Sequence, residues 1–287
     1  MNKASLPLVT IAVSAYNHER YIKQCLTSLL QQTYKNVELI VFDDGSTDNT
    51  ANIIEGFHKT HKFHFEKRPN SGLTPTLNAI LKLAKGKYFT VLGSDDIAML
   101  DKTEKQVALM EQDESIALCG GNILKIDQHG TLSSDQKTRA AHELDFKSLM
   151  LNTKSGLPAP TLFFRTDILR KVGGYHEEIK LEDVYIALKI SEPGHKLFFM
   201  NDVLAYYRIH PENTYKNLIF MSDSILATLD QFKSSPFYLP AQQKRLVSLF
   251  IKASKRNKPL ARTLIKKIKL KNYSIRVAKG VLRLLLP

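Results

Sequence analysis

The first half of the chain alternates short apolar runs with segments of helical periodicity. The apolar runs at 8–14, 37–42, 62–66 and 88–92 predict strands, and apolar spacing at 18–32, 51–58 and 74–84 predicts helices between them. This alternation indicates βαβ units and a mostly parallel sheet. The carboxyl ends of such strands share one edge of the sheet, where ligands bind. We therefore expect an α/β fold with a functional site at that edge.

The pattern changes twice along the rest of the chain. Strands are predicted at 117–126 and 161–165, a polar loop at 128–143, a short helix ending at Val172, a helix at 182–190, and a closing apolar segment at 197–209. From Asn213 onward the periodicity is helical, at 246–252, 260–270 and 273–286. We therefore divide the chain into an α/β domain, residues 1–212, and an α-helical C-terminal extension, residues 213–287.

Charge is distributed unevenly between these two parts. The 287 residues are 43% hydrophobic and carry a formal net charge of +13. Residues 211–287 hold 16 Lys and Arg against three Asp and Glu, whereas residues 1–210 hold 25 of each kind. No acidic residue follows Asp230. A neutral body with a basic tail indicates a polyanionic partner: an anionic membrane, a phosphate-bearing substrate or nucleic acid.

The basic tail favours a membrane surface among these partners. Its apolar residues between 265 and 286 are interspersed with Lys and Arg, a composition typical of helices that lie in an anionic membrane interface. A helix packed on the first domain, with its basic face in water, is the alternative. Aromatic residues after Tyr238 are limited to Phe250 and Tyr273, which argues against nucleic acid because stacking platforms are scarce.

The sequence predicts no membrane-spanning segment and no signal peptide. No run of about 18 apolar residues occurs, and Met1 to Leu8 lacks the apolar stretch of a signal peptide. The two cysteines, Cys25 and Cys119, belong to no metal-binding motif and predict reduced thiols. We expect a cytoplasmic protein, peripheral on the inner face of the cytoplasmic membrane.

Two acidic clusters directly follow predicted strands. In Asp43-Asp44-Gly45-Ser46-Thr47-Asp48, a carboxylate could accept hydrogen bonds from a base or ribose, and the turn leads into a helix N-terminus that favours phosphate. The same residue types also form a structural Asx turn with Asp48 as helix cap. In Ser94-Asp95-Asp96, adjacent carboxylates repel unless a cation such as Mg²⁺ or Mn²⁺ lies between them and a ligand. A solvated loop is the alternative there.

Two further groups carry possible chemistry. Glu182-Asp183 begins a predicted helix, where a carboxylate can act as a general base or simply suit the helix dipole. His210, in Tyr207-Arg208-Ile209-His210, is a candidate metal ligand or phosphate contact, or else a structural histidine.

In order and spacing, these groups resemble the family 2 glycosyltransferases with a GT-A fold. The resemblance extends from about Leu8 to Asn213. It is carried by VTIAVSAYNHERYIKQCLTSLLQQTYKNVELIVFDDGSTD, RPNSGLTPTLNAILKLAKGKYFTVLGSDD, LPAPTLFFRTDILRKVGGY, LEDVYIALKI and YRIH. It implies a Rossmann-like, mostly parallel sheet flanked by helices, with the basic helical extension added.

The resemblance also implies roles for individual residues. It places Asp183 as the catalytic base, and Asp95, Asp96 and His210 around a divalent cation, Mn²⁺ or Mg²⁺. Asp95 is also expected to bind ribose. The positions expected to bind the nucleotide are Ala15, Tyr16, Asn17, Glu19, Asp44, Arg68 and Asn78. The chain departs from the family's Asp-x-Asp-Asp pattern at its first position, which is Gly93.

The implied activity is inverting transfer of a sugar from a nucleotide-diphosphate sugar, with UDP the commonest nucleotide. The acceptor is expected to be a hydroxyl of a glycan or lipid-linked molecule in cell-surface polysaccharide or lipopolysaccharide synthesis. A nucleotidyltransferase would instead favour a Gly-rich, basic loop after the first strand, where this chain has Ser14-Ala15-Tyr16-Asn17. A non-catalytic polyanion-binding or membrane-binding protein is the other alternative, and the retained aspartates argue against it.

Overall fold

The computed structural model describes residues 6–213 and 216–285. Two stretches with predictions therefore lie partly outside the described residues, at Met1–Ser5 and at Leu286. The chain forms two compact units. Unit 1 comprises residues 1–146, 155–178 and 182–210, and unit 2 comprises residues 147–154, 179–181 and 211–287. Unit 2 thus contains two short segments from within the first part of the chain.

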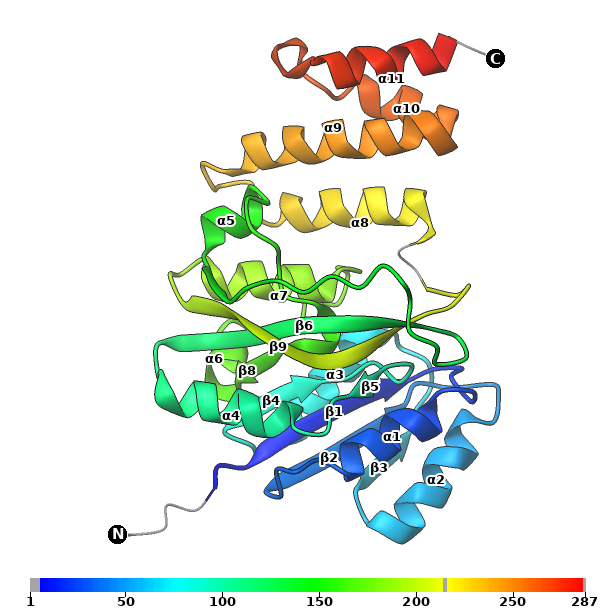
Figure 1. Ribbon diagram of the computed structural model, residues 1–287, viewed down its shortest axis with the longest axis vertical. Helices are drawn as coiled ribbons and strands as arrows, with labels where there is room; N and C mark the ends of the chain where they lie inside the picture. Colours follow the sequence, from blue (N-terminus) through cyan, green and yellow to red (C-terminus); the bar gives the residue numbers. More distant parts are fainter. Residues whose placement is uncertain (1–5, 214–215, 286–287) are drawn as a thin grey trace. The chain divides into compact units, whose positions relative to one another are not determined.

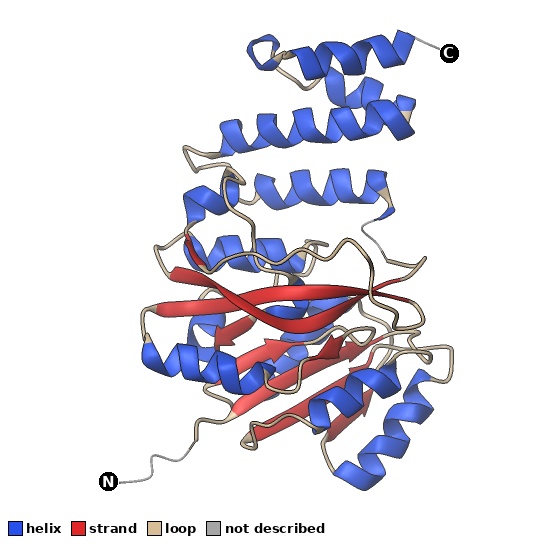
Figure 2. Ribbon diagram, in the orientation of Figure 1, coloured by secondary structure: helices blue, strands red, loops and turns tan. Residues whose placement is uncertain are grey.

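Unit 1 is built on one nine-stranded mixed sheet with the order β3-β2-β1-β4-β8-β6-β9-β5, in which β7 also pairs with β9. The described strands, red in Figure 2, all fall within the residues of this unit. The strands are β1 (Val9–Ala15), β2 (Val37–Asp43), β3 (His64–Lys67), β4 (Tyr88–Val91), β5 (Ile97–Ala98), β6 (Ile116–Asp127), β7 (His142–Leu144), β8 (Phe163–Arg165) and β9 (Lys196–Ile209).

The direction of the strands determines which loops meet. Strands β3, β2, β1 and β4 are mutually parallel, as the sequence predicts. β8 runs antiparallel to both β4 and β6, and β6 is parallel to β9. It follows that β9 points the same way as β4. The carboxyl ends of β1, β2, β4 and β9 therefore share one edge of the sheet, and His210 arrives there directly after β9.

Helices cover both faces of this sheet (Figure 1). In α1, Ile22, Cys25, Leu26 and Leu29 form one buried stripe that belongs to the same hydrophobic core as the residues of β1. Cys25 and Cys119 are buried free thiols, as expected from the sequence. The helices of unit 1 are α1 (Ile22–Leu30), α2 (Thr50–His61), α3 (Leu73–Leu83), α4 (Lys102–Gln112), α6 (Thr166–Lys171) and α7 (Glu182–Ser191).

The described part of unit 2 is helical and has a core of its own. This core is formed by Leu246, Leu249, Phe250, Ala253, Ala261, Leu264, Ile268 and Val277. Among the residues that the structure describes, no helix combines the length and apolar character needed to cross a membrane. The helices are α5 (Phe146–Met150), α8 (Leu218–Asp230), α9 (Tyr238–Arg256), α10 (Lys258–Ile265) and α11 (Ile275–Leu285), with a 3₁₀ turn at Leu270–Asn272.

Several elements differ from the sequence prediction. The helix predicted at 246–252 is the second half of α9, whose first turns contain Pro240 and glutamines that weaken the apolar pattern. Helices α4 and α5 and strands β5 and β7 were not predicted, and α8 lies in the part of the chain that was expected to be helical. The N-cap of α2 is Asn49, and Asp48 instead accepts hydrogen bonds from the N–H groups of Thr50 and Glu19. Asp48 therefore ties two loops together rather than capping the helix.

One lysine is fully enclosed in unit 1. Lys102 begins α4 with 2% of its surface exposed, and its Nζ donates to Thr90 Oγ1 at 2.8 Å. Its nearest aromatic contact is the Phe163 ring, at 6.0 Å. Burial lowers the pKa of Lys102 to about 7, because an ammonium loses its hydration there. The fold therefore contains a lysine that is half-neutral near physiological pH.

We predict that Lys102 makes stability depend on pH. The unfolded chain holds the lysine proton up to about pH 10, while the folded protein releases it near pH 7. The unfolded state binds more protons in this window, so the free energy of unfolding should rise by about 4 kcal/mol between pH 7 and 10. Lys102→Met should remove that rise and raise stability at pH 7. Urea unfolding at several pH values measures it, with the exposed Lys82→Met as control; a slope unchanged in Lys102→Met contradicts it.

Candidate functional site

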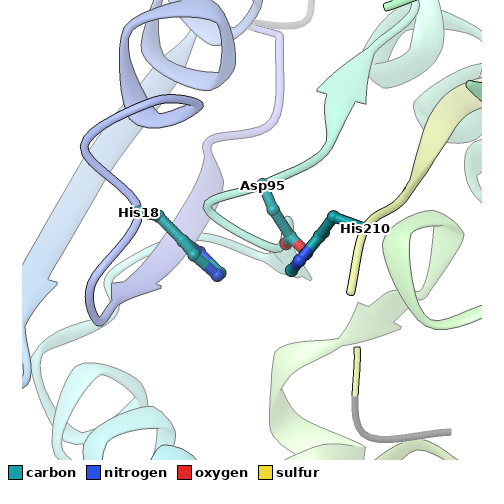
Figure 3. Close-up of side chains that lie close together, drawn as sticks. All are labelled: His18, Asp95 and His210. Carbon is teal, nitrogen blue, oxygen red and sulfur yellow. The ribbon is translucent and has the colours of Figure 1, made fainter. Parts of the chain in front are cut away.

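Three side chains from three distant loops meet at the shared edge of the sheet. His18 follows β1, Asp95 follows β4 and His210 follows β9. Their possible ligand atoms all lie within 4.8 Å of one another. Figure 3 shows the two imidazoles and the carboxylate pointing into the same space. Two imidazole nitrogens and a carboxylate oxygen form a donor set suited to a divalent transition metal.

Hydrogen bonds orient this group. His210 Nε2 lies 3.0 Å from Asp95 Oδ2, and His18 Nδ1 is hydrogen-bonded to Ser94 Oγ at 2.7 Å. The Tyr21 ring lies 5.2 Å from the His210 ring and 5.9 Å from the His18 ring, measured between centroids. His210 is 3% exposed, so its ring is held in a largely enclosed position. The site is therefore ordered by packing as well as by polar contacts.

Charge around the two carboxylates is unequal. Burial alone would raise the pKa of Asp95, but the hydrogen bond from His210 and the charge of His18 outweigh it and lower that pKa. Burial and the neighbouring charge of Asp95 hold the pKa of Asp96 well above its usual range. The pair thus favours a single negative charge, on Asp95.

Asp96 lies outside the group of ligand atoms. It is 4% exposed, and its Oδ1 accepts a hydrogen bond from the backbone N–H of Arg208 at 2.9 Å. The Arg208 guanidinium also donates to the Asp95 carbonyl at 2.8 Å and to Gln24 Oε1 at 2.6 Å. Asp96 and Arg208 therefore join the ends of β4 and β9.

Steric constraints favour glycine at position 93 of this loop. A Cβ at Gly93 would lie 2.8 Å from Asp95 Oδ1 and 3.0 Å from Asp96 Oδ2. Any side chain there would press on both carboxylates. The departure from the family's usual aspartate is thus matched by carboxylates that occupy the space beside Gly93.

The loops after β1 and β2 are bonded to each other. Asn17, in the left-handed region with φ 52°, accepts from the Thr47 N–H, and its own N–H donates to Ser46 Oγ. Glu19 Oε2 accepts from the Asn49 N–H at 2.9 Å. These predicted nucleotide-binding side chains therefore hold the loops in place. Ala15 is the buried last residue of β1, and Tyr16, which follows it, is 46% exposed.

Asp44 is buried and its carboxylate is fully engaged. Oδ1 accepts from the Ser71 N–H, Ser71 Oγ and Thr76 Oγ1, and Oδ2 accepts from the Gly72 N–H at 2.8 Å. These bonds fix the segment that leads into α3. Asp44 was predicted to contact the base. In the structure its carboxylate anchors this loop, so a contact with the base would add to the hydrogen bonds it already accepts.

Two buried polar atoms nearby have no partner among the described residues: Asp43 Oδ1 and Arg68 Nη1. The Arg68 guanidinium lies over the Phe42 ring at 5.0 Å, and its backbone N–H donates to the Asp43 carbonyl. Buried polar atoms are rarely left unsatisfied, so both are available to a ligand. Sequence reasoning named Asp44, and not Asp43, as the contact of the base.

Asn78 holds the turn that leads toward α7. Its side-chain amide donates to the Tyr175 carbonyl at 2.7 Å and accepts from the Tyr175 N–H at 2.9 Å. Gly174, with φ +70°, packs so closely that a Cβ would lie 2.8 Å from Asn78 Oδ1. Asn78 was predicted to approach the nucleotide, but both of its polar atoms bond to this turn.

Asp183 lies half-buried in the first turn of α7. Its Oδ1 accepts from the Val184 N–H at 2.8 Å, and burial raises its pKa. Burial and the charge of Asp183 raise the pKa of Glu182 to about 8. Asp183 is not part of the group formed by His18, Asp95 and His210. A carboxylate with a raised pKa is a stronger base, which suits proton abstraction.

His18 and Arg208, like Asp43, were not assigned by sequence reasoning. Both lie in stretches that were singled out, HERY and YRIH. A signal existed for His18, since it follows β1 at the edge where the acidic clusters also lie. None existed for Arg208, because its guanidinium bonds to two backbone carbonyls and to Gln24, which are distant in sequence.

Comparison with known proteins identifies the family. The profile described as "Glycosyl transferase family 2" matches residues 10–173, more than half of the chain. The chain belongs to glycosyl transferase family 2.

Curated relatives of this family 2 chain are glycosyltransferases. It is 30% identical over 212 residues to an uncharacterised glycosyltransferase of Rickettsia prowazekii, covering 72% of this chain and 66% of that protein. It is also 30% identical to the Escherichia coli UDP-Glc:alpha-D-GlcNAc-diphosphoundecaprenol beta-1,3-glucosyltransferase WfaP, covering 76% of this chain and 85% of WfaP. The match spans slightly less than two thirds of the Rickettsia protein's length and 42% of a Haemophilus influenzae relative's.

Solved structures confirm the fold class. Staphylococcus aureus TarS 1–349 in complex with UDP-GlcNAc matches with a TM-score of 0.66 at 17% identity, covering 96% of this chain and 81% of that one. The mannosyltransferase PcManGT of Pyrobaculum calidifontis, in complex with GDP-Man and Mn²⁺, matches with a TM-score of 0.65 at 16% identity, covering 98% and 86%. The α/β GT-A fold with C-terminal helices, expected from the sequence, is therefore confirmed.

We predict that Asp44 is needed for stability. Asp44→Ala would leave the N–H groups of Ser71 and Gly72 and two hydroxyls without their buried acceptor. The free energy of unfolding should fall by about 3 kcal/mol. Denaturant unfolding measures it. The exposed Asp167→Ala, which removes only a surface pair with Lys171, should change it by no more than about 0.5 kcal/mol. Equal effects of the two substitutions would refute the anchoring role.

Proposed function

We propose that this chain is an inverting glycosyltransferase that moves a sugar from a nucleoside-diphosphate sugar to an acceptor hydroxyl. The observation that carries the proposal is the meeting of His18, Asp95 and His210 beside the loops that follow β1, β2 and β4. In a member of family 2, a cation site at this edge suits a diphosphate.

The proposed donor is a UDP-sugar. WfaP is named for UDP-Glc, and TarS was solved with UDP-GlcNAc. The unpartnered Asp43 Oδ1 and Arg68 Nη1 support a polar ligand at the end of β2, where the base would lie. Tyr16, exposed directly after β1, offers a ring surface beside it. A thermal-shift comparison of UDP-, GDP- and dTDP-sugars tests the nucleotide; stabilisation by GDP-sugars alone contradicts UDP.

The proposed cofactor is Mn²⁺ or Mg²⁺, held by Asp95 and His210 as expected and also by His18. The residues fit a cation, because two imidazoles and an ionised carboxylate converge. Two nitrogen ligands favour Mn²⁺ over Mg²⁺, which prefers oxygen. When bound, the ion offsets charge on the diphosphate. Asp96 supports the site through Arg208 and the Asp95 loop.

Asp183 is the proposed catalytic base. Its carboxylate takes the proton of the acceptor hydroxyl as that oxygen bonds to the anomeric carbon and the bond from that carbon to the diphosphate oxygen breaks. One displacement inverts the anomeric configuration. The raised pKa of Asp183 supports the role, since its carboxylate binds a proton more readily than an ordinary aspartate.

Asp183→Asn should reduce sugar transfer by roughly 10²–10⁴-fold, because the amide cannot take the proton. Binding of the nucleotide, measured by calorimetry, should be retained. Glu182→Gln, one residue earlier on the same helix turn, is the matched control and should retain most transfer activity. Full turnover by Asp183→Asn would remove it from the catalytic role.

His18→Ala should weaken Mn²⁺ binding by roughly 10–100-fold, because one of three converging ligands is lost. Electron paramagnetic resonance of free Mn²⁺ titrated with the protein measures this without an activity assay. His129→Ala, at an exposed turn, is the control and should bind Mn²⁺ as the parent protein does. Unchanged affinity in His18→Ala would exclude His18 as a ligand.

The proposed acceptor is a glycan or lipid-linked hydroxyl in cell-surface polysaccharide synthesis. WfaP, whose name specifies a diphosphoundecaprenol-linked acceptor, supports a lipid-linked molecule. The basic C-terminal helices support a peripheral position on the inner, anionic face of the cytoplasmic membrane. An enzyme held there would meet such an acceptor on a surface rather than in bulk water.

A further inference from the structure

A basic groove lies within unit 2, separate from the residues considered so far. Its volume is about 790 Å³, and its walls come from α9 and from the segment that includes α11. Six of the ten lining residues are Lys or Arg, and none is acidic. The six are Lys244, Lys252 and Lys255 from α9, and Arg276, Lys279 and Arg283 from α11.

Five of these six cations are unpaired. Lys244 Nζ donates to the carbonyls of Leu151 and Asn152. The other five form no hydrogen bond or ion pair with any residue in the described part of the chain. Each helix places its cations three, four or eight residues apart, so they share one side of that helix. Like charges so arranged repel one another, and a bound anion would relieve the repulsion.

The two walls of the groove are fixed by the core of unit 2. A Cβ at Gly280 would lie 2.6 Å from Phe250 Cε1, so the backbone of α11 packs directly on the Phe250 ring of α9. Val277, on the same side of α11, is fully buried. Apolar packing therefore sets the separation of the two rows of cations. The groove does not depend on polar contacts across it and is already formed before any anion binds.

Helix α11 has three distinct sides. At 3.6 residues per turn, Val277, Gly280 and Leu284 face the core, and Arg276, Lys279 and Arg283 form the next side around the helix. The third side is apolar and exposed, with Ile275 and Leu285 each 77% exposed and Leu282 57%. Leu270, 81% exposed, lies just before the helix. An exposed apolar side beside a cationic side is the arrangement of a helix in a membrane interface.

We propose that the groove between α9 and α11 binds the phosphate headgroup of an anionic lipid, while the exposed side of α11 enters the acyl region. The exposed apolar side of α11 favours a lipid headgroup over a free phosphate, because only a lipid brings an acyl region that this side can contact. This inference rests on the peripheral membrane association proposed above and identifies the part of the chain that makes the contact with the membrane. It does not depend on the catalytic residues.

Two matched triple variants test the groove. The groove variant is Lys252→Gln with Arg276→Gln and Lys279→Gln. The control variant is Lys266→Gln with Arg262→Gln and Lys267→Gln, three exposed cations of α10 and its end that do not line the groove. Both lose two lysines and one arginine. Flotation with phosphatidylcholine vesicles, with and without phosphatidylglycerol, measures affinity, and calorimetry measures binding of inorganic pyrophosphate.

The groove variant should bind phosphatidylglycerol vesicles roughly 100-fold more weakly than the parent chain, at about 1 kcal/mol for each lost cation. The control variant should stay within about threefold, because its three exposed cations do not line the groove and are screened by salt. Ile275→Ser with Leu282→Ser should also release the chain from these vesicles. Circular dichroism and hydrolysis of a UDP-sugar should be unchanged in every variant.

Three outcomes would overturn the proposal. Equal losses in the groove and control variants would show a general attraction without a defined site. Pyrophosphate binding without vesicle binding would assign the groove to a soluble anion. Full vesicle binding by the Ile275→Ser, Leu282→Ser variant would exclude the apolar contact. A failure of the catalytic proposal would appear instead as absent UDP-sugar turnover in the parent chain, with vesicle binding intact.

Discussion

The buried guanidinium of Arg208 is the contact on which the site depends most. It is 1% exposed and reaches the Asp95 carbonyl, the Asp127 carbonyl and Gln24 Oε1, while its backbone N–H bonds to Asp96. These partners come from the ends of β4 and β6 and from α1. His210 follows two residues later, so its 3.0 Å approach to Asp95 is set by this network. Because a buried cation without partners is costly, the network forms completely or fails as a whole.

Some acidic residues at the sheet edge stabilise the loops, and others keep carboxylate oxygens available to a ligand. The carboxylates of Asp44, Asp48 and Glu19 accept hydrogen bonds from neighbouring N–H groups and hydroxyls. Asp43 keeps one oxygen without a partner, and Asp95 faces two imidazoles. A rigid frame of structural carboxylates thus surrounds the few whose oxygens remain available. Such a frame holds a ligand's position without having to rearrange when the ligand arrives.

The sequence predicted the parallel half of the sheet and the edge at which the site lies, because strands β1 to β4 and the helices between them follow local periodicity. The family resemblance implied that Asp95 and His210 surround one cation, and in the structure the two side chains are 3.0 Å apart. The sequence could not show that the carboxylate of Asp44 is fully hydrogen-bonded, since those bonds come from Ser71 and Gly72, about 27 residues away. The position of His18 after β1 was visible in the sequence, but its proximity to His210 was not, because it requires β9 to lie parallel to β6 and to end at the same edge.

The chain path through unit 2 has a consequence for how the protein is made. Residues 147–154 and 179–181 belong to unit 2, although the rest of that unit comes after residue 210. A ribosome therefore releases both segments long before the helices they join exist. Ile179, buried in the finished protein, belongs to a unit whose main helices are synthesised only later. Removing the residues after 210 would therefore take away most of unit 2 and leave the segments 147–154 and 179–181 without the helices they belong with.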